Sequence, residues 1–128
     1  MAVAWAFKDE AEGYADTVLD YISDSGAVVP DIWVYETVNA LLVGERRRRI
    51  MPADSARFIR LLQDLPLEVE EMTFAGLSDL ALLAREYELT AYDAAYLAVA
   101  ARRGIPLATQ DRALQKAARR SGAEVFDS

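Results

Sequence analysis

Apolar residues recur along this chain in two alternating patterns. In the longer stretches they return every three to four residues, which is the spacing of an amphipathic helix. Between these stretches lie short apolar or alternating runs that are typical of strands, such as "GAVVPD" and "IPLAT". The pattern predicts helices over 10–23, 31–43, 53–64, 74–87, 90–104 and 112–121, and strands over 27–30, 67–72, 105–109 and 123–126.

Strands that alternate with helices in this way predict an α/β fold with a mostly parallel sheet. No repeat, linker or low-complexity tract divides the chain, so we expect a single domain over residues 1–128. In parallel sheets of this kind, ligands bind at the carboxyl ends of the strands. Polar residues that directly follow a predicted strand are therefore of particular interest.

The most apolar of the predicted helices contains one carboxylate. In "LTAYDAAYLAVAARRG", every residue from Ala91 to Ala101 is apolar or aromatic except Asp93. An ionised carboxylate is costly to bury unless it is paired, hydrogen-bonded or bound to a metal. "TAYD" also fits a capping box with Thr90 as the N-cap, so a capping role for Asp93 stands beside a metal-binding one.

The composition narrows the chemistry that is open to this chain. It has no cysteine and no histidine, which excludes disulfides, thiol catalysis, histidine bases and histidine metal ligands. A metal site would have to consist of oxygen ligands, which favours Mg²⁺ or Mn²⁺. The 128 residues are 53% hydrophobic, yet charges interrupt every apolar run before it could span a bilayer. No signal peptide is recognisable, so we expect a cytoplasmic protein without a membrane partner.

Charge is spread unevenly along the chain. The net charge is −7, from 21 acidic and 14 basic residues, which argues against a simple nucleic-acid coat. Basic residues nevertheless cluster in "ERRRR" at 45–49 and over 101–120. Such clusters are most often solvated helix faces. Basic patches around an acidic pocket would also suit an enzyme that acts on a polyanion through metal ions.

Two further acids lie at suggestive positions. Asp111, in "LATQDRAL", directly follows a predicted strand and begins a helix, where Asp is also a preferred N-cap. Glu36 shares a helix face with Asn39, although a Glu in that setting is most often an ordinary surface residue. Clustered carboxylates repel one another, which raises their affinity for divalent cations. Such cations can activate water and stabilise the leaving oxygen of a phosphodiester.

Several of these stretches together resemble a known family. "PDIWVYETVNALL", "LTAYDAAYLAVAARRGIPLATQDRAL" and the opening "WAFKDE" are similar to PIN-domain proteins, specifically the VapC-type toxins of toxin–antitoxin pairs. The resemblance covers nearly the whole chain. It implies an α/β/α sandwich with a mostly parallel central sheet and Mg²⁺-dependent cleavage of RNA, with Mn²⁺ as a substitute. It also implies a small antitoxin protein that covers the site, and a homodimer.

The resemblance assigns roles to individual residues. Glu36, Asp93 and Asp111 match three of the family's four acids and would be catalytic metal ligands, directly or through water. A metal-activated water would then attack phosphorus. Two polar neighbours would line the same pocket, and four arginines would bind RNA phosphates. The neighbours are Asn39 and Thr109, and the arginines are Arg46, Arg47, Arg102 and Arg103.

The opening of the chain departs from the family pattern. The family's first strand ends in Asp, whereas "MAVAWAFKDE" matches the helix that follows this strand. We therefore expect the central first strand and the fourth acid to be missing, with Asp9 and Glu10 too far from the site to replace that acid. Either the chain is N-terminally truncated, which we favour, or it is a degenerate module that binds its partner without cutting RNA. A third alternative is an unrelated α/β protein whose aspartates are helix caps.

Overall fold

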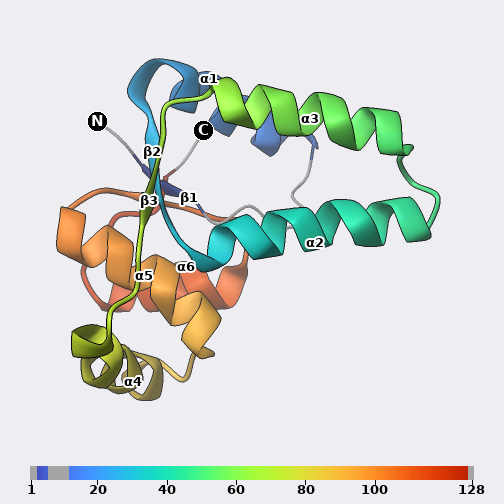
Figure 1. Ribbon diagram of the computed structural model, residues 1–128. Helices are drawn as coiled ribbons and strands as arrows, with labels where there is room; N and C mark the ends of the chain where they lie inside the picture. The colour runs from blue at the N-terminus through green and yellow to red at the C-terminus, as the bar shows by residue number, and fades with distance from the viewer. Residues whose placement is uncertain (1–2, 6–11, 127–128) are drawn as a thin grey trace.

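The computed structural model of the protein describes residues 3–5 and 12–126, and the side chains from residue 17 onward. Strands and helices alternate along these residues, as the sequence predicted (Figure 1). The strands are β1 Val3–Trp5, β2 Ala27–Pro30, β3 Leu67–Glu70 and β4 Leu107–Ala108. The helices are α1 Glu12–Ser25, α2 Ile32–Arg46, α3 Pro52–Asp64, the short 3₁₀ helix η1 Phe74–Gly76, α4 Leu77–Glu86, α5 Ala91–Arg103 and α6 Arg112–Arg120.

The four strands form one parallel sheet in the order β3-β2-β1-β4. Because the strands are parallel, their carboxyl ends meet at one edge of the sheet. The chain leaves β2 toward α2 and leaves β4 toward α6 at this edge. The predicted α/β class with a parallel sheet is therefore confirmed.

The expectation that the first strand is missing is wrong. Val3–Trp5 form β1 in the middle of the sheet, where Val3 pairs with Ala27 and Ala4 pairs with Leu107. Without this short apolar segment, the facing edges of β2 and β4 would lack hydrogen-bonding partners. β1 lies between them and pairs with both. The resemblance matches this segment to the helix after the family's first strand, and three residues are too few for their own spacing to distinguish a strand from a helix. Asp9 and Glu10 lie outside the described residues.

The predicted last strand over 123–126 is also wrong in extent. The structure has only an isolated bridge there, between Leu107 and Val125. Two backbone hydrogen bonds hold this bridge, from Leu107 N to Glu124 O and from Phe126 N to Leu107 O, both at 2.8 Å. Because β4 is itself only two residues long, it offers few positions for a parallel neighbour to pair with.

Helix α5 lies at the centre of the core. It begins after the N-cap Thr90 and ends at Gly104, whose φ of +62° suits the left-handed C-cap position. All seven residues over 94–100 are buried, because α5 packs against β1, β2, α4 and α6. Among the described residues, no helix is long and apolar enough to cross a membrane, α5 included.

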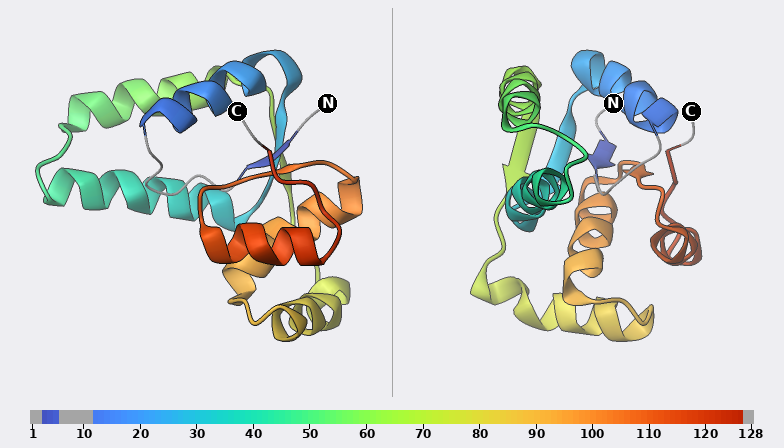
Figure 2. Two further views of the ribbon diagram at one scale, coloured as in Figure 1. Left: turned by 180° about the vertical axis from the view of Figure 1, so that it is seen from behind. Right: turned by 90° about the vertical axis from the view of Figure 1, so that its right-hand side faces the viewer.

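Helices α2 and α3 form an antiparallel pair that extends away from the sheet (Figures 1 and 2). Helix α3 begins one residue before the predicted 53–64, at Pro52, because the first backbone N–H of a helix has no intrahelical acceptor and proline lacks that N–H. The end of α2 and the turn after it carry four consecutive exposed arginines, 46–49. Arg48 has a φ of +58°, so this turn holds a bulky side chain in the left-handed region.

Candidate active site

Glu36 and Tyr96 connect two helices that are far apart in the sequence. Glu36 lies in the second turn of α2, shortly after the carboxyl end of β2, and is half-buried. Tyr96 lies in α5 and is 0% exposed. Its hydroxyl donates a hydrogen bond of 2.5 Å to Glu36 Oε1. A carboxylate near the carboxyl edge of the sheet is thus held by a donor from the core.

Asp93 lies in the first turn of α5, three residues before Tyr96, and is half-buried. Its backbone N–H donates to Thr90 Oγ1 at 3.1 Å, so Thr90 caps the helix as predicted. Burial raises the pKa of the Tyr96 hydroxyl, and its hydrogen bond to Glu36 and the charges of Glu36 and Asp93 raise it further. Charges shift a pKa in this way only from nearby. Glu36 and Asp93 therefore share one neighbourhood around this hydroxyl.

Asp111 and Thr109 follow β4 directly, at the same edge of the sheet. Asp111 is the N-cap of α6, and its Oδ1 accepts a hydrogen bond from Leu114 N at 3.0 Å. Thr109 is 2% exposed, and its hydroxyl accepts from Asp111 N at 3.1 Å. The Gln115 side chain donates to Thr109 O at 2.7 Å. The capping interpretation of Asp111 is thus confirmed, although a cap can also bind a cation.

The predicted metal ligands are brought together only in part. Glu36 and Asp93 converge on Tyr96, whereas Asp111 is exposed and caps α6. Among the side chains that the structure describes, no group of three or more acids is close enough to hold a metal ion. Carboxylate oxygens are the ligands that Mg²⁺ prefers, so the donor chemistry fits this ion. The described residues supply Glu36, which contacts the Tyr96 hydroxyl, and Asp93, whose charge acts on the same hydroxyl, as candidate ligands.

Sequence reasoning missed Tyr96 as a residue of this site. An aromatic residue in an apolar helix is usually part of the core, so the residue type of Tyr96 alone did not mark it. The available signal was its spacing, because a residue three positions after Asp93 lies on the same helix face. Asn39, by contrast, is exposed on α2 three residues after Glu36.

The four candidate RNA-binding arginines fall into two groups. Arg46 and Arg47 are exposed at the end of α2, where the α2–α3 pair projects from the body of the molecule (Figure 1). Arg102 and Arg103 form ion pairs with β3. Arg102 Nε donates to Glu70 Oε1 at 2.7 Å, and Arg103 Nε donates to Glu70 Oε2 at 3.0 Å.

Arg103 also pairs with a second carboxylate of β3. Its Nη2 donates to Glu68, and this hydrogen bond and the Arg103 charge hold the pKa of the Glu68 carboxyl below its usual value. The charges of Arg102 and Arg103 are thus balanced by carboxylates. Arg46 and Arg47 have no ion pair with any described acid, so they are the stronger phosphate-binding candidates.

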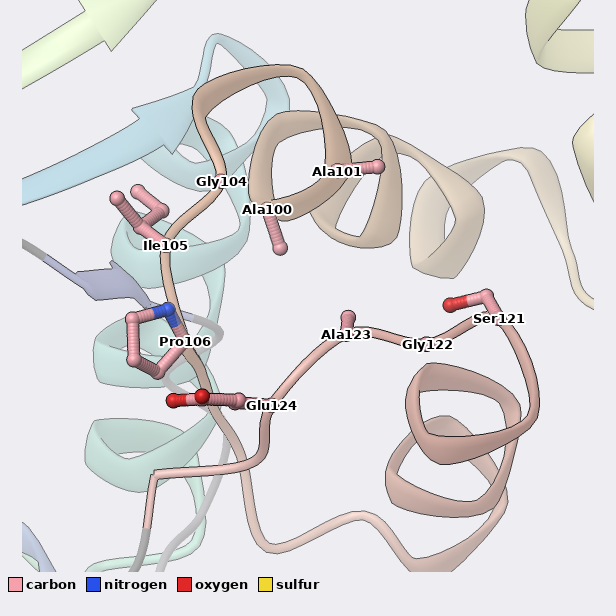
Figure 3. A pocket seen from close by; sticks show the side chains of 9 residues that line it. All are labelled: Ala100, Ala101, Gly104, Ile105, Pro106, Ser121, Gly122, Ala123 and Glu124. Atoms are coloured by element: carbon pink, nitrogen blue, oxygen red, sulfur yellow. The ribbon is translucent and has the colours of Figure 1, made fainter.

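Two hollows adjoin α5. One, of about 180 Å³, adjoins the first turn of α5 and the carboxyl ends of β2 and β3. The other, of about 330 Å³, lies between the end of α5 and the segment after α6, and Figure 3 shows its mostly small side chains. Gly104, Ile105 and Pro106 line it before β4 begins. It is therefore at the other end of β4 from Asp111.

Comparison with known proteins agrees with this architecture. The PIN domain family matches residues 2–120 of the chain. The crystal structure of PAE2754 from Pyrobaculum aerophilum is similar, with a TM-score of 0.65 and 29% sequence identity. The likeness covers 82% of this chain and 69% of that one. No curated protein matches the chain.

The family match spans the whole parallel sheet and all three predicted acids. PIN domains are generally nucleases and typically depend on divalent metal ions. The pair of carboxylates around Tyr96 lies where ligands bind in a parallel α/β sheet. From its match and its fold, this chain belongs to the PIN domain family.

Proposed function

We propose that this chain is a Mg²⁺-dependent ribonuclease of the VapC type, with Mn²⁺ as a substitute. It would act in the cytoplasm as the toxin of a toxin–antitoxin pair, as a homodimer held in check by a small antitoxin protein. The observation that carries the nuclease proposal is the hydrogen bond from the Tyr96 hydroxyl to Glu36, with Asp93 one turn before Tyr96 on α5. The toxin role is supported by the sequence motifs around these residues.

In this proposal Glu36 and Asp93 bind the cation, and Asp111 adds a third carboxylate from the end of β4. Tyr96 orients the Glu36 carboxylate through its hydrogen bond. Thr109 and Asn39 would line the metal site. The hydroxyl of Thr109 is held there by the hydrogen bond that it accepts from the backbone N–H of Asp111. A bound divalent ion would supply an activated water and neutralise phosphate charge.

The arginines at the end of α2 would bind the phosphate backbone of RNA. Arg46 follows Glu36 by ten residues, which is about 15 Å along the helix axis. An RNA strand that crosses the acidic pair could therefore reach these arginines several nucleotides away. This arrangement would compensate for the overall charge of −7, which otherwise repels RNA.

The test is RNA cleavage in Mn²⁺ by the full chain and by Asp93→Asn. We expect the variant to lose cleavage, because a neutral amide is a poor ligand for a hard cation. Asp79→Asn is the matched control, since Asp79 occupies the same first-turn position in α4. Full cleavage by Asp93→Asn would refute its role as a ligand, and an equal loss in Asp79→Asn would show that the effect is not specific.

A second candidate is a PIN module that binds its partner without cutting RNA. Two observations favour it. Asp111 caps α6, and no cluster of three acids that could hold a metal ion is found among the described residues. Calorimetric titration with Mn²⁺ separates the two candidates. A nuclease binds Mn²⁺ and loses binding in Asp93→Asn, whereas the binding module shows no Mn²⁺ binding that depends on Asp93.

A further inference from the structure

A small apolar pocket adjoins the Glu36–Tyr96 hydrogen bond. Its volume is about 180 Å³, and it lies where the carboxyl ends of β2 and β3 meet the first turn of α5. Its lining is mostly apolar, with three acidic residues and one arginine among the lining residues. The apolar lining comes from Pro30, Ile32, Met72, Leu80, Ala91, Tyr92 and Ala95.

The pocket is one helical turn away from the candidate active site. Ile32 precedes Glu36 by four residues on α2, and Tyr92 precedes Tyr96 by four residues on α5. Residues four apart lie on the same face of a helix, separated by about 6 Å along the axis. The pocket is thus adjacent to the acidic pair on both helices.

Hydrogen bonds between separate elements hold the pocket walls together. Met72 N donates to Asp31 Oδ2 at 3.1 Å, and Asp31 N donates to Glu70 O at 3.2 Å. Arg102 from α5 donates to the Glu70 side chain. These contacts tie the segment after β3 to the start of α2 and to the end of α5. The pocket is therefore preformed, as ligand pockets usually are.

We propose that this pocket binds one unpaired base of the RNA substrate, stacked on the ring of Tyr92. The inference rests on the proposed ribonuclease function and adds a base-binding subsite to it. Tyr92 lines the pocket and is nevertheless 59% exposed, so its ring is accessible to a ligand. Unpaired RNA bases are bound by stacking on aromatic side chains and by hydrogen bonds to their edges.

The size and charge of the pocket favour a base over other ligands. Pockets for whole drug-sized molecules measure roughly 300–1,000 Å³, so this one suits a single flat ring system. Three carboxylates, Asp31, Glu70 and Glu71, line the pocket against one arginine, Arg102, so the lining has a net negative charge although Glu70 is paired with Arg102 and Arg103. A phosphate would be repelled there, whereas the amino and imino groups of a base can donate hydrogen bonds to carboxylates.

Uncharged nucleosides test the subsite without RNA cleavage or metal. We would titrate adenosine, guanosine, cytidine and uridine into the full chain in EDTA, following the protein by NMR. Tyr92→Ala removes the stacking surface, and Ala95→Met fills the pocket from α5. Phe74→Ala is the matched control, because Phe74 is 92% exposed and does not line this pocket.

We expect at least one nucleoside to bind, and both pocket variants to weaken binding about tenfold or more, as loss of base stacking does. The Phe74 control should bind like the parent chain. Failure of all four nucleosides to bind would overturn the proposal, as would unchanged binding in both pocket variants. Because the two variants change the pocket in opposite ways, misfolding of one would leave the other as a test.

RNA cleavage in Mn²⁺ separates this inference from the proposed function. If both are right, Tyr92→Ala and Ala95→Met raise KM about tenfold with little change in kcat. Nucleoside binding without any RNA cleavage would support the pocket and contradict the nuclease. Cleavage with an unchanged KM in both variants would overturn the pocket and leave the nuclease intact. If the variants instead release only a bound antitoxin, the pocket binds protein and the base proposal is wrong.

Discussion

The Tyr96 hydroxyl donates a hydrogen bond to the carboxylate of Glu36, sixty residues earlier in the chain. The Tyr96 ring is fixed in the core, where it is 0% exposed, whereas a Glu side chain alone has several rotatable bonds. The core of the protein thereby orients a candidate metal ligand. Asp93 is close enough for its charge to act on the same hydroxyl.

Tyr96→Phe should destabilise the protein by about 1–2 kcal/mol, because it removes a hydrogen bond to a charged group while keeping the ring. Urea unfolding of the parent and the variant measures this difference. Tyr35→Phe is the control, since Tyr35 is 73% exposed and should be neutral. Equal stability of parent and Tyr96→Phe would show that the hydrogen bond contributes nothing net.

Stability should fall as the pH rises above about 10, the ordinary pKa of tyrosine. Burial and the two carboxylates raise the pKa of Tyr96, so its hydroxyl stays protonated in the native state while the unfolded chain loses the proton. The unfolded state then binds fewer protons, and this one group lowers the unfolding free energy by about 1.4 kcal/mol per pH unit. The contribution is fully present below pH 10.

Urea unfolding between pH 8 and pH 11 checks this dependence. Tyr96→Phe should remove the contribution of Tyr96 to the slope of unfolding free energy against pH. The variant and the parent should therefore converge in stability at high pH. A parallel decline of the two proteins over this range would contradict a raised pKa at Tyr96.

Asp111→Asn and Asp111→Ala separate capping from metal binding. Asn is as good an N-cap as Asp, so Asp111→Asn should leave stability unchanged, whereas Asp111→Ala should cost about 1 kcal/mol. The reason is the hydrogen bond that Asp111 Oδ1 accepts from Leu114 N. If Asp111 is also a ligand, both variants lose Mn²⁺ affinity in calorimetry. If Asp111→Asn leaves both stability and Mn²⁺ affinity unchanged and only Asp111→Ala differs from the parent, Asp111 is a cap alone.

Arg47→Gln should weaken RNA binding and reduce its salt dependence. Each phosphate contact on single-stranded RNA contributes about 0.7 to the slope of log K against log salt, so one lost contact should lower the slope by that amount. Arg103→Gln is the control, because its charge is already balanced by Glu68 and Glu70. Binding of RNA over a salt series measures both. An equal effect of the two substitutions would argue against a dedicated phosphate contact at Arg47.

The local signals in the sequence were reliable because their causes are local. Thr90 and Asp111 cap the helices that the sequence assigned to them, through backbone N–H groups three residues away. Pro52 begins α3, and Gly104 ends α5 with a positive φ that other residues disfavour. The alternation of strands and helices follows from the same short-range patterns, and it was sufficient to predict a parallel α/β sheet.

The errors came where short segments depend on distant neighbours. Val3–Trp5 form a strand because β2 and β4 lie on either side of them, which no spacing within three residues could reveal. Residues 123–126 have strand-like sequence, yet they pair only at Val125 because β4 ends after Ala108. In both cases hydrogen-bonding partners far along the chain decided the outcome.

By itself, the sequence of this protein determined where most helices begin and end, the α/β class, and which acids were worth considering. The tertiary structure decided which of those groups meet. It joined Glu36 to Tyr96 and directed Arg103 to Glu68, contacts that span 60 and 35 residues. Such contacts depend on how helices pack on the sheet, and packing is a property of the whole core that no short stretch of sequence encodes.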